Sequence, residues 1–293
     1  MNLPCRSALY MPASSPRALA KGPSLAADAI VVDLEDSVVP EAKGEARQAA
    51  VRALAGQDYA HRVRALRLNA HDTEWYAEDI RAAFDAVPDV VVLPKVESAD
   101  ALHALADALA ADARGRDVRI WAMLETPRAV LGAEAVAGVA AAGVPLETLV
   151  VGNNDLARAG GLPLATSRTH LHPWLMTFVA AAKANDLTVL DGVFNDFADL
   201  VSFERECLEG VAMGMDGRTL IHPSQIEVAN RAFTPDADAV ADARAIVAAF
   251  EAPEAAGRGA IRLDGRMVER LHLDMARRTL ALAERAAAVA DRS

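Results

Sequence analysis

Short apolar runs alternate along most of the chain with longer segments in which apolar residues recur at helical spacing. Because the runs are short and each is followed by a loop, they predict β-strands, and the segments between them predict helices. Eight strands are predicted, at residues 7–11, 29–34, 64–68, 90–93, the run that ends at Glu125, the run that ends at Asp155, 187–193 and 210–215. This regular alternation indicates a parallel sheet covered by helices.

Such strands can form either a closed barrel or an open doubly wound sheet. Polar residues follow nearly every predicted strand, which favours the closed ring, because active-site loops surround the strand ends of a barrel. No G-x-G-x-x-G pattern opens a helix after the first strand, so a dinucleotide-binding sheet has no support. The length of 293 residues also suits one (β/α)8 TIM barrel with a C-terminal helical extension.

The pattern changes after Pro235. Residues 236–250 predict one amphipathic helix, residues 251–259 are rich in Ala, Gly and Pro, residues 261–268 are short and extended, and residues 269–291 predict a long helix. We expect residues 1–250 to form a catalytic barrel domain. Residues 251–293 would form an extension that lies over the barrel mouth or against a neighbouring subunit.

Composition narrows the class of protein. The net charge of −11, from 30 basic and 41 acidic residues, argues against a nucleic-acid-binding protein. The two cysteines, Cys5 and Cys207, provide neither a disulfide framework nor a thiolate metal site, and they suit free thiols in a reducing compartment. No apolar run approaches the roughly 20 residues needed to cross a bilayer, and the N-terminus lacks the apolar stretch of a signal peptide. We therefore expect a cytoplasmic protein that does not contact membranes.

Two of the apolar runs end on a carboxylate, Glu125 in the first and Asp155 in the second. In a parallel barrel both side chains would reach the same rim. Two carboxylates with little soft or basic chemistry beside them suit a hard divalent cation, Mg²⁺ or alternatively Mn²⁺. Other polar residues at predicted strand ends are Tyr10, Asp33, Glu35, Asp36, Arg67, Asn69, Lys95, Glu97 and Asp216. This excess of carboxylates requires either a cation or partial protonation.

Nine motifs in collinear order resemble a known family. They are RSALYMP from Arg6, DLEDSV from Asp33, RLN from Arg67, LPKVE from Leu93, LET from Leu124, GNNDL from Gly152, GVAMG from Gly210, IHPSQ from Ile221 and DGRMV from Asp264. The chain resembles the citrate lyase β-subunit-like proteins of the HpcH/HpaI aldolase group, which includes malyl-CoA and citramalyl-CoA lyases. The resemblance implies a Mg²⁺-dependent TIM barrel, usually a homotrimer, that makes or breaks a carbon–carbon bond next to a coenzyme A thioester.

The resemblance also implies roles for particular residues. Glu125 and Asp155 would be the metal ligands, and Arg67 would hold the substrate carboxylate or the developing enolate oxygen. Planar guanidinium groups match such anions well. Positions that match substrate and coenzyme A contacts are Tyr10, Arg17, Lys21, Ile221 and His222. Residues expected behind these groups, orienting Arg67 or metal-bound water, are Asp33, Glu35 and Asp36.

The acid–base group is where the chain departs from the family pattern. The lyases use an Asp two positions after the Met of their D-G-x-M segment, supplied by an adjacent subunit. Here Glu269 occupies that position, and its side chain is one methylene longer. Glu can transfer the same proton with a different reach. Asp264 is a weaker alternative.

Structural roles remain open for several of these residues. Arg67 could instead pair with Asp33 or Glu35, and His222 could cap the helix that begins at Pro223. We expect Lys95 and Glu97 to form an ion pair at the rim.

The primary functional hypothesis is a lyase or condensing enzyme that interconverts malyl-CoA or citramalyl-CoA with acetyl-CoA and an α-oxo acid. One alternative is an aldolase of free 2-oxo acids, although Tyr10, Arg17 and Lys21 would then have no ligand. Another is a citrate lyase β-like subunit that acts on an acyl carrier protein within a complex.

Overall fold

The computed structural model describes residues 5–163, 167–252 and 257–290. These residues divide into two compact units, Cys5–Asn230 and the segment from Arg231 onward. In the described part of the chain, no helix is both long and apolar enough to span a membrane.

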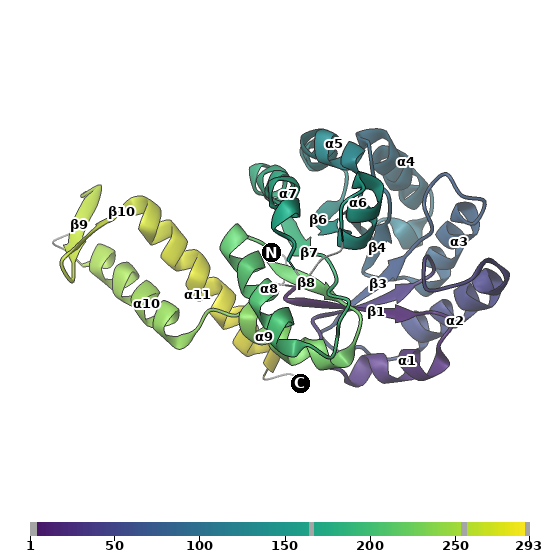
Figure 1. Ribbon diagram of the computed structural model, residues 1–293, viewed down its shortest axis with the longest axis horizontal. Coiled ribbons are helices and arrows are strands. Elements are labelled where there is room, and N and C mark those ends of the chain that lie inside the picture. Colours follow the sequence, from purple (N-terminus) through teal and green to yellow (C-terminus); the bar gives the residue numbers. More distant parts are fainter. Residues whose placement is uncertain (1–4, 164–166, 253–256, 291–293) are drawn as a thin grey trace. The chain divides into compact units, whose positions relative to one another are not determined.

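The first unit is a closed barrel of eight parallel strands, which confirms the predicted fold class (Figure 1). Each strand pairs with the next, and β1 closes the ring by pairing with β8. The strands are β1 (Ser7–Pro12), β2 (Ala29–Asp33), β3 (Val63–Arg67), β4 (Val90–Leu93), β5 (Arg119–Leu124), β6 (Leu146–Val151), β7 (Thr188–Asp191) and β8 (Gly217–Leu220).

Helices connect the strands and lie outside the ring (Figure 1). They are α1 (Pro16–Lys21), α2 (Lys43–Gly56), α3 (Tyr76–Ala86), α4 (Ala99–Ala110), α5 (Pro127–Ala137), α6 (Asn153–Gly160), α7 (His172–Ala184), α8 (Leu200–Met213) and α9 (Ile226–Ala232). The local sequence determines where several of these helices begin. At α5, the Thr126 hydroxyl accepts the N–H of Ala129 at 3.1 Å, and Pro127 occupies the first turn, where no N–H is needed.

The barrel interior is filled by residues two apart on each strand, as the period of a strand requires. Val90 and Val92 of β4 and Trp121 and Met123 of β5 are buried in one apolar cluster. Met123 points into the barrel from the carboxyl-terminal part of β5, and its side chain therefore lies at the base of the loops that follow the strands. Cys5 and Cys207 are buried and free, as the sequence suggested.

The eighth strand was predicted in the wrong place. Residues 210–213 are the last turn of α8, which ends at Gly214 with a φ of 91°. Val211 is 41% exposed there, so this apolar run is the surface end of a helix and not a buried strand, and β8 follows at Gly217–Leu220 with Arg218 fully buried. Asp216 therefore precedes its strand and lies at the opposite end of the barrel from the predicted site, where it accepts the N–H of Val189 at 2.9 Å.

A second correction concerns Asp155. The strand β6 ends at Val151, and Asp155 lies in the first turn of the short helix α6. The predicted strand ended at Asp155, but the residues after Val151 turn into this helix, whose Leu156 is fully buried.

The second unit contains α10 (Ala237–Glu251), an antiparallel hairpin of β9 (Ala260–Leu263) and β10 (Arg266–Glu269), and α11 (Arg270–Ala290). Its buried core includes Ile246 of α10, Val268 of β10 and Ala276 of α11. The predicted barrel domain of residues 1–250 included α10, whereas contacts group this helix with α11 because its apolar face packs there.

Candidate active site at the carboxyl ends of the barrel strands

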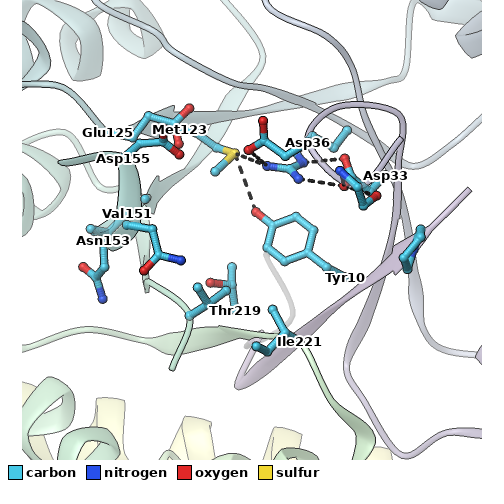
Figure 2. Close-up of a pocket in the computed structure, with 16 residues that line it drawn as sticks. Tyr10, Asp33, Asp36, Met123, Glu125, Val151, Asn153, Asp155, Thr219 and Ile221 are labelled. Carbon is cyan, nitrogen blue, oxygen red and sulfur yellow. Dashed lines mark hydrogen bonds and ion pairs between the residues drawn. The ribbon is translucent and has the colours of Figure 1, made fainter. Parts of the chain in front are cut away.

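A pocket of about 340 Å³ opens among the loops that follow the barrel strands (Figure 2). Its walls come from the ends of β1, β2, β3, β5, β6 and β8 and from the start of α6. The lining residues are Tyr10, Pro12, Asp33, Asp36, Ser37, Arg67, Met123, Glu125, Val151, Gly152, Asn153, Asn154, Asp155, Val193, Thr219 and Ile221. Many predicted site residues are thus brought together.

Glu125 follows β5 and is only 1% exposed. Its Oε1 accepts the backbone N–H of Lys95 at 2.7 Å. Burial, followed by the negative charges of Glu35 and Asp155, raises the pKa of Glu125 to about 8. The carboxyl lies against Gly152, where a Cβ atom would lie only 2.5 Å from the Cβ of Glu125. Glycine at this position makes the space that the carboxylate occupies.

Asp155 faces the same pocket from the first turn of α6, with its side chain 22% exposed and paired with Arg158. Within the described ranges, no cluster of three or more His, Cys, Asp or Glu residues has metal-site geometry. A cation held by Glu125 and Asp155 would therefore have to complete its coordination with ligand and water oxygens. Mg²⁺ is commonly bound in this way, by one or two carboxylates.

Arg67, at the end of β3, is held in a network of carboxylates. Its Nε and Nη2 donate to the two oxygens of Asp33 at 2.6 and 2.7 Å, and its Nη1 lies 2.8 Å from Oε2 of Glu35. Burial alone would lower the pKa of Arg67, but Asp33 outweighs it and raises that pKa, so the guanidinium stays charged. The structural pairing that the sequence left open is present, and Arg67 nevertheless lines the pocket.

Glu35 and Lys95 form the other ion pair behind the pocket. Lys95 Nζ lies 3.0 Å from Oε1 of Glu35, so the predicted pairing of Lys95 with Glu97 is wrong. Lys95 has a φ of 53°, which turns its backbone N–H toward Glu125 and its side chain toward Glu35. Glu97 instead accepts the hydroxyl of Thr126 at 2.7 Å.

Sequence reasoning missed Lys43, which organises the loop after β2. The ammonium group is buried and donates to the carbonyls of Leu34 and Glu35 at 2.7 and 2.8 Å, and to Oδ1 of Asn69 at 2.6 Å. Asn69 therefore holds Lys43 in place behind the pocket and does not line the pocket itself. A lysine in the first turn of an ordinary helix gives no signal of this role.

Asn153 was also missed, and it is the first residue of α6. Its buried Oδ1 has no hydrogen-bond partner among the described residues. Its side chain fits against Gly192, where a Cβ atom would lie 2.5 Å from the Cγ of Asn153. The motif G-N-N-D-L could have drawn attention to this residue as well as to Asp155.

The remaining predicted residues lie at the edge of the pocket or outside it. Ile221 lines the pocket, while Arg17 and Lys21 are exposed on α1. His222 caps the turn that follows β8, because its Nδ1 accepts the N–H of Ser224 at 3.2 Å.

Both candidates for the acid–base group belong to the C-terminal unit. Glu269 is the last residue of β10. Asp264 lies in the turn between β9 and β10, with a φ of 48°. Their assignment as acid–base groups stays a prediction.

The similarity to known proteins extends over the whole barrel. Residues 6–223 match the HpcH/HpaI aldolase/citrate lyase family. The chain is 42% identical over 285 residues to the (3S)-malyl-CoA thioesterase of Cereibacter sphaeroides, covering 97% of this chain and 96% of that protein. It is 34% identical over 289 residues to the L-malyl-CoA/beta-methylmalyl-CoA lyase of Rhodobacter capsulatus, covering 90% of each.

Among solved structures, CitE of Mycobacterium tuberculosis in complex with magnesium, acetoacetate and coenzyme A is similar, with a TM-score of 0.77 and 30% identity. The alignment covers 95% of this chain and 97% of that chain. The family match contains all eight barrel strands and every residue that lines the pocket. This chain therefore belongs to the HpcH/HpaI aldolase/citrate lyase family.

Proposed function

We propose that this protein is a divalent-metal-dependent carbon–carbon lyase or condensing enzyme for a short 3-hydroxyacyl-CoA thioester. It would interconvert a thioester of the malyl-CoA or citramalyl-CoA type with acetyl-CoA and an α-oxo acid. The observation that carries this proposal is the pair of carboxylates, Glu125 and Asp155, on one pocket that also contains Arg67. The similar CitE structure contains magnesium, acetoacetate and coenzyme A.

Glu125 and Asp155 fit a hard cation by their chemistry. A buried carboxyl whose pKa is raised to about 8 by burial and by neighbouring carboxylates would be stabilised as an anion by a bound cation. Oxygen donors are the ligands that Mg²⁺ prefers, and Mn²⁺ accepts them too. When bound, Mg²⁺ would polarise the carbonyl group of an α-oxo acid and fix its orientation.

The protein's own groups would perform the remaining work. Arg67 would direct Nη1 at a substrate oxygen, and its bidentate pairing with Asp33 holds the guanidinium plane in place. Glu269, with Asp264 as the alternative, would transfer the proton to or from the acetyl carbon. That group would come from the C-terminal unit of the same chain or of a neighbour in a homotrimer. Exposed Arg17 and Lys21 are available for the phosphates of coenzyme A, with Ile221 and His222 as further contacts.

Hydrolysis of the same thioester is the second candidate function. It is favoured by the Cereibacter sphaeroides relative, which is 42% identical to this chain and is named a malyl-CoA thioesterase. The two reactions use the same substrate and differ in the bond that is broken. Cleavage of the carbon–carbon bond gives glyoxylate and acetyl-CoA, whereas hydrolysis gives malate and free coenzyme A.

One assay distinguishes these reactions. Purified protein is incubated with malyl-CoA and Mg²⁺, and glyoxylate is followed as its phenylhydrazone while free thiol is followed in parallel with a thiol reagent. We expect glyoxylate in proportion to the thioester consumed and no thiol. Free thiol without glyoxylate would establish the thioesterase. Absence of free thiol and of the α-oxo acid, which is glyoxylate from malyl-CoA and pyruvate from citramalyl-CoA, with a divalent cation bound, would refute both functions.

Substitution of Gly152 by Ala tests the metal site without removing a ligand. The added methyl group would overlap the Glu125 side chain, so that carboxylate must move. We expect at least about tenfold weaker Mg²⁺ binding in calorimetric titration, the size of effect seen when groups that orient ligands are lost. Gly44→Ala is the matched control, because a Cβ atom there has no neighbour within 4 Å. Unchanged Mg²⁺ affinity in Gly152→Ala would argue against Glu125 as a ligand.

A further inference from the structure

Two hydrogen-bond donors in the pocket point at a sulfur atom. The Tyr10 hydroxyl lies 3.6 Å from Sδ of Met123, and Nη1 of Arg67 lies 4.0 Å from the same sulfur. The guanidinium also lies over the Tyr10 ring, 4.7 Å from its centre. Figure 2 shows the two dashed lines that meet at Met123.

A thioether is a weak acceptor for two such donors. The sulfur is the one hydrogen-bond partner of the Tyr10 hydroxyl within the described residues. Arg67 commits Nε and Nη2 to Asp33, and its Nη1, which lies 2.8 Å from Oε2 of Glu35, carries a second hydrogen that can face the pocket. Burial raises the pKa of Tyr10, which keeps the phenol protonated and able to donate at any physiological pH. The pocket therefore contains the Tyr10 hydroxyl and one N–H of Arg67 Nη1, and the acceptor that they share is the weak thioether of Met123.

Met123 can give way to a better acceptor. Its side chain is unbranched and has three rotatable bonds, so it can change rotamer without moving β5. Moving the sulfur aside would leave both donors directed at one point in the pocket. An oxygen atom that carries negative charge is the acceptor that such a pair binds most strongly.

We propose that the Tyr10 hydroxyl and Nη1 of Arg67 together bind the thioester carbonyl oxygen of the substrate, at the position where Sδ of Met123 lies. This inference rests on the proposed action on an acyl-CoA thioester. It makes Tyr10 a catalytic residue, whereas the family resemblance assigned it to the body of coenzyme A. The two donors would stabilise the transition state more than the ground state, because the oxygen is more negative there.

The same oxygen gains charge in both candidate reactions. In carbon–carbon cleavage, the electron pair of the breaking bond moves into the acetyl thioester, giving an enolate, while the 3-hydroxyl loses its proton and becomes the carbonyl of the oxo acid. An acid then protonates the enolate carbon. In hydrolysis, water adds to the thioester carbon, its proton goes to a base, and the carbonyl oxygen becomes an oxyanion until the thiolate leaves. The inference therefore holds whichever bond is broken.

Tyr10→Phe tests the inference, because it removes one hydroxyl and keeps the ring beneath Arg67. We expect kcat to fall about a hundredfold, as for loss of one oxyanion donor in other enzymes, while KM changes less than about threefold. The second readout is binding of an unreactive coenzyme A analogue in which –CH2–COO⁻ replaces –S–CO–CH3, so that its carboxylate matches the enolate. The variant should bind this analogue much more weakly than the wild type and bind free coenzyme A equally well.

Tyr59→Phe is the matched control, since the buried Tyr59 hydroxyl has no hydrogen-bond partner in the described part of the chain and does not line the pocket. It should retain the wild-type kcat, and both variants should keep the wild-type thermal midpoint. The inference is overturned if Tyr10→Phe retains kcat, or if it loses affinity for free coenzyme A as much as for the analogue. A wild-type protein that neither turns over malyl-type thioesters nor binds the analogue would instead refute the proposed function, and the inference with it.

Discussion

Glu125→Gln should abolish binding of Mg²⁺ and lower kcat by about a thousandfold or more, since a catalytic cation supplies several kcal/mol of charge stabilisation. The amide has nearly the same shape as the carboxyl group, so the fold should be unchanged. Gln can no longer offer an anionic oxygen to a cation. Asp155→Asn should have a similar effect, with a smaller loss of Mg²⁺ affinity because Asp155 is partly exposed and already paired with Arg158. Calorimetric titration with Mg²⁺ and steady-state kinetics measure the two effects separately.

Glu97→Gln is the control for these variants. Glu97 follows β4 as Glu125 follows β5, but its carboxylate accepts the Thr126 hydroxyl and does not line the pocket. Its replacement should leave kcat and Mg²⁺ affinity within about twofold of the wild type, as expected for a group outside the reacting centre. Wild-type kcat in Glu125→Gln, or full activity in the presence of a chelator, would show that the reaction needs no cation at this site.

The second large effect concerns stability. Asp191→Asn should reduce the free energy of unfolding by about 3–5 kcal/mol, the cost of removing one partner from a buried ion pair. Asp191 ends β7 and is fully buried. Its carboxylate accepts Nη1 of Arg168 at 2.6 and 2.7 Å and lies 3.4 Å from Nη1 of Arg218. Without the charge of Asp191, the buried guanidinium groups of Arg168 and Arg218 would be less fully neutralised, which destabilises the folded state. Urea unfolding followed by circular dichroism measures the loss.

Asp85→Asn provides the comparison at the surface. Asp85 pairs with Arg114 at 2.7 Å, but both side chains are at least half exposed, so its removal should cost no more than about 1 kcal/mol. Equal stability losses in the two variants would show that the buried network has no special role.

The pH dependence of the free energy of unfolding tests the same network, because the direction of the expected change is known. Burial alone would raise the pKa of Asp191, but Arg218 and Arg168 outweigh it and lower that pKa. Since the folded pKa lies below the unfolded value of about 3.9, the stabilisation is fully present above that pH and is lost as the pH falls through the folded pKa. The stability difference between the wild type and Asp191→Asn should therefore be constant from pH 6 to 8, to about 0.5 kcal/mol, and shrink below about pH 4.

Charge balance gives a physical reason for a cation in this pocket. The carboxylates at or just behind its wall are Asp33, Glu35, Asp36, Glu125 and Asp155. The cations that pair with this group are Arg67 and Lys95, together with Arg158 on α6. Arg67 is already bonded to Asp33, so the negative charge near Glu125 is only partly compensated. This uncompensated negative charge contributes to the raised pKa of Glu125 in the protein without a cation. A bound divalent cation would lower that pKa.

The sequence by itself determined the alternation of strands and helices, the barrel and the family. These features depend on the spacing of apolar residues within one element and on motifs in a fixed order, so each can be read locally. Glu125 was identified for this reason, as the carboxylate that follows a clear apolar run. The eighth strand was misplaced because the apolar end of α8 has the same local pattern as a short strand.

Only the tertiary structure decided which polar groups pair. Arg67 meets Asp33 34 residues away, and Arg168 meets Asp191 23 residues away, because closing the barrel brings neighbouring strands and loops together. Likewise, the two donors at Met123 come from β1 and β3, and the sulfur between them comes from β5. Buried polar groups must find partners wherever the fold places them, and that choice is made by geometry across the barrel, which no local pattern records.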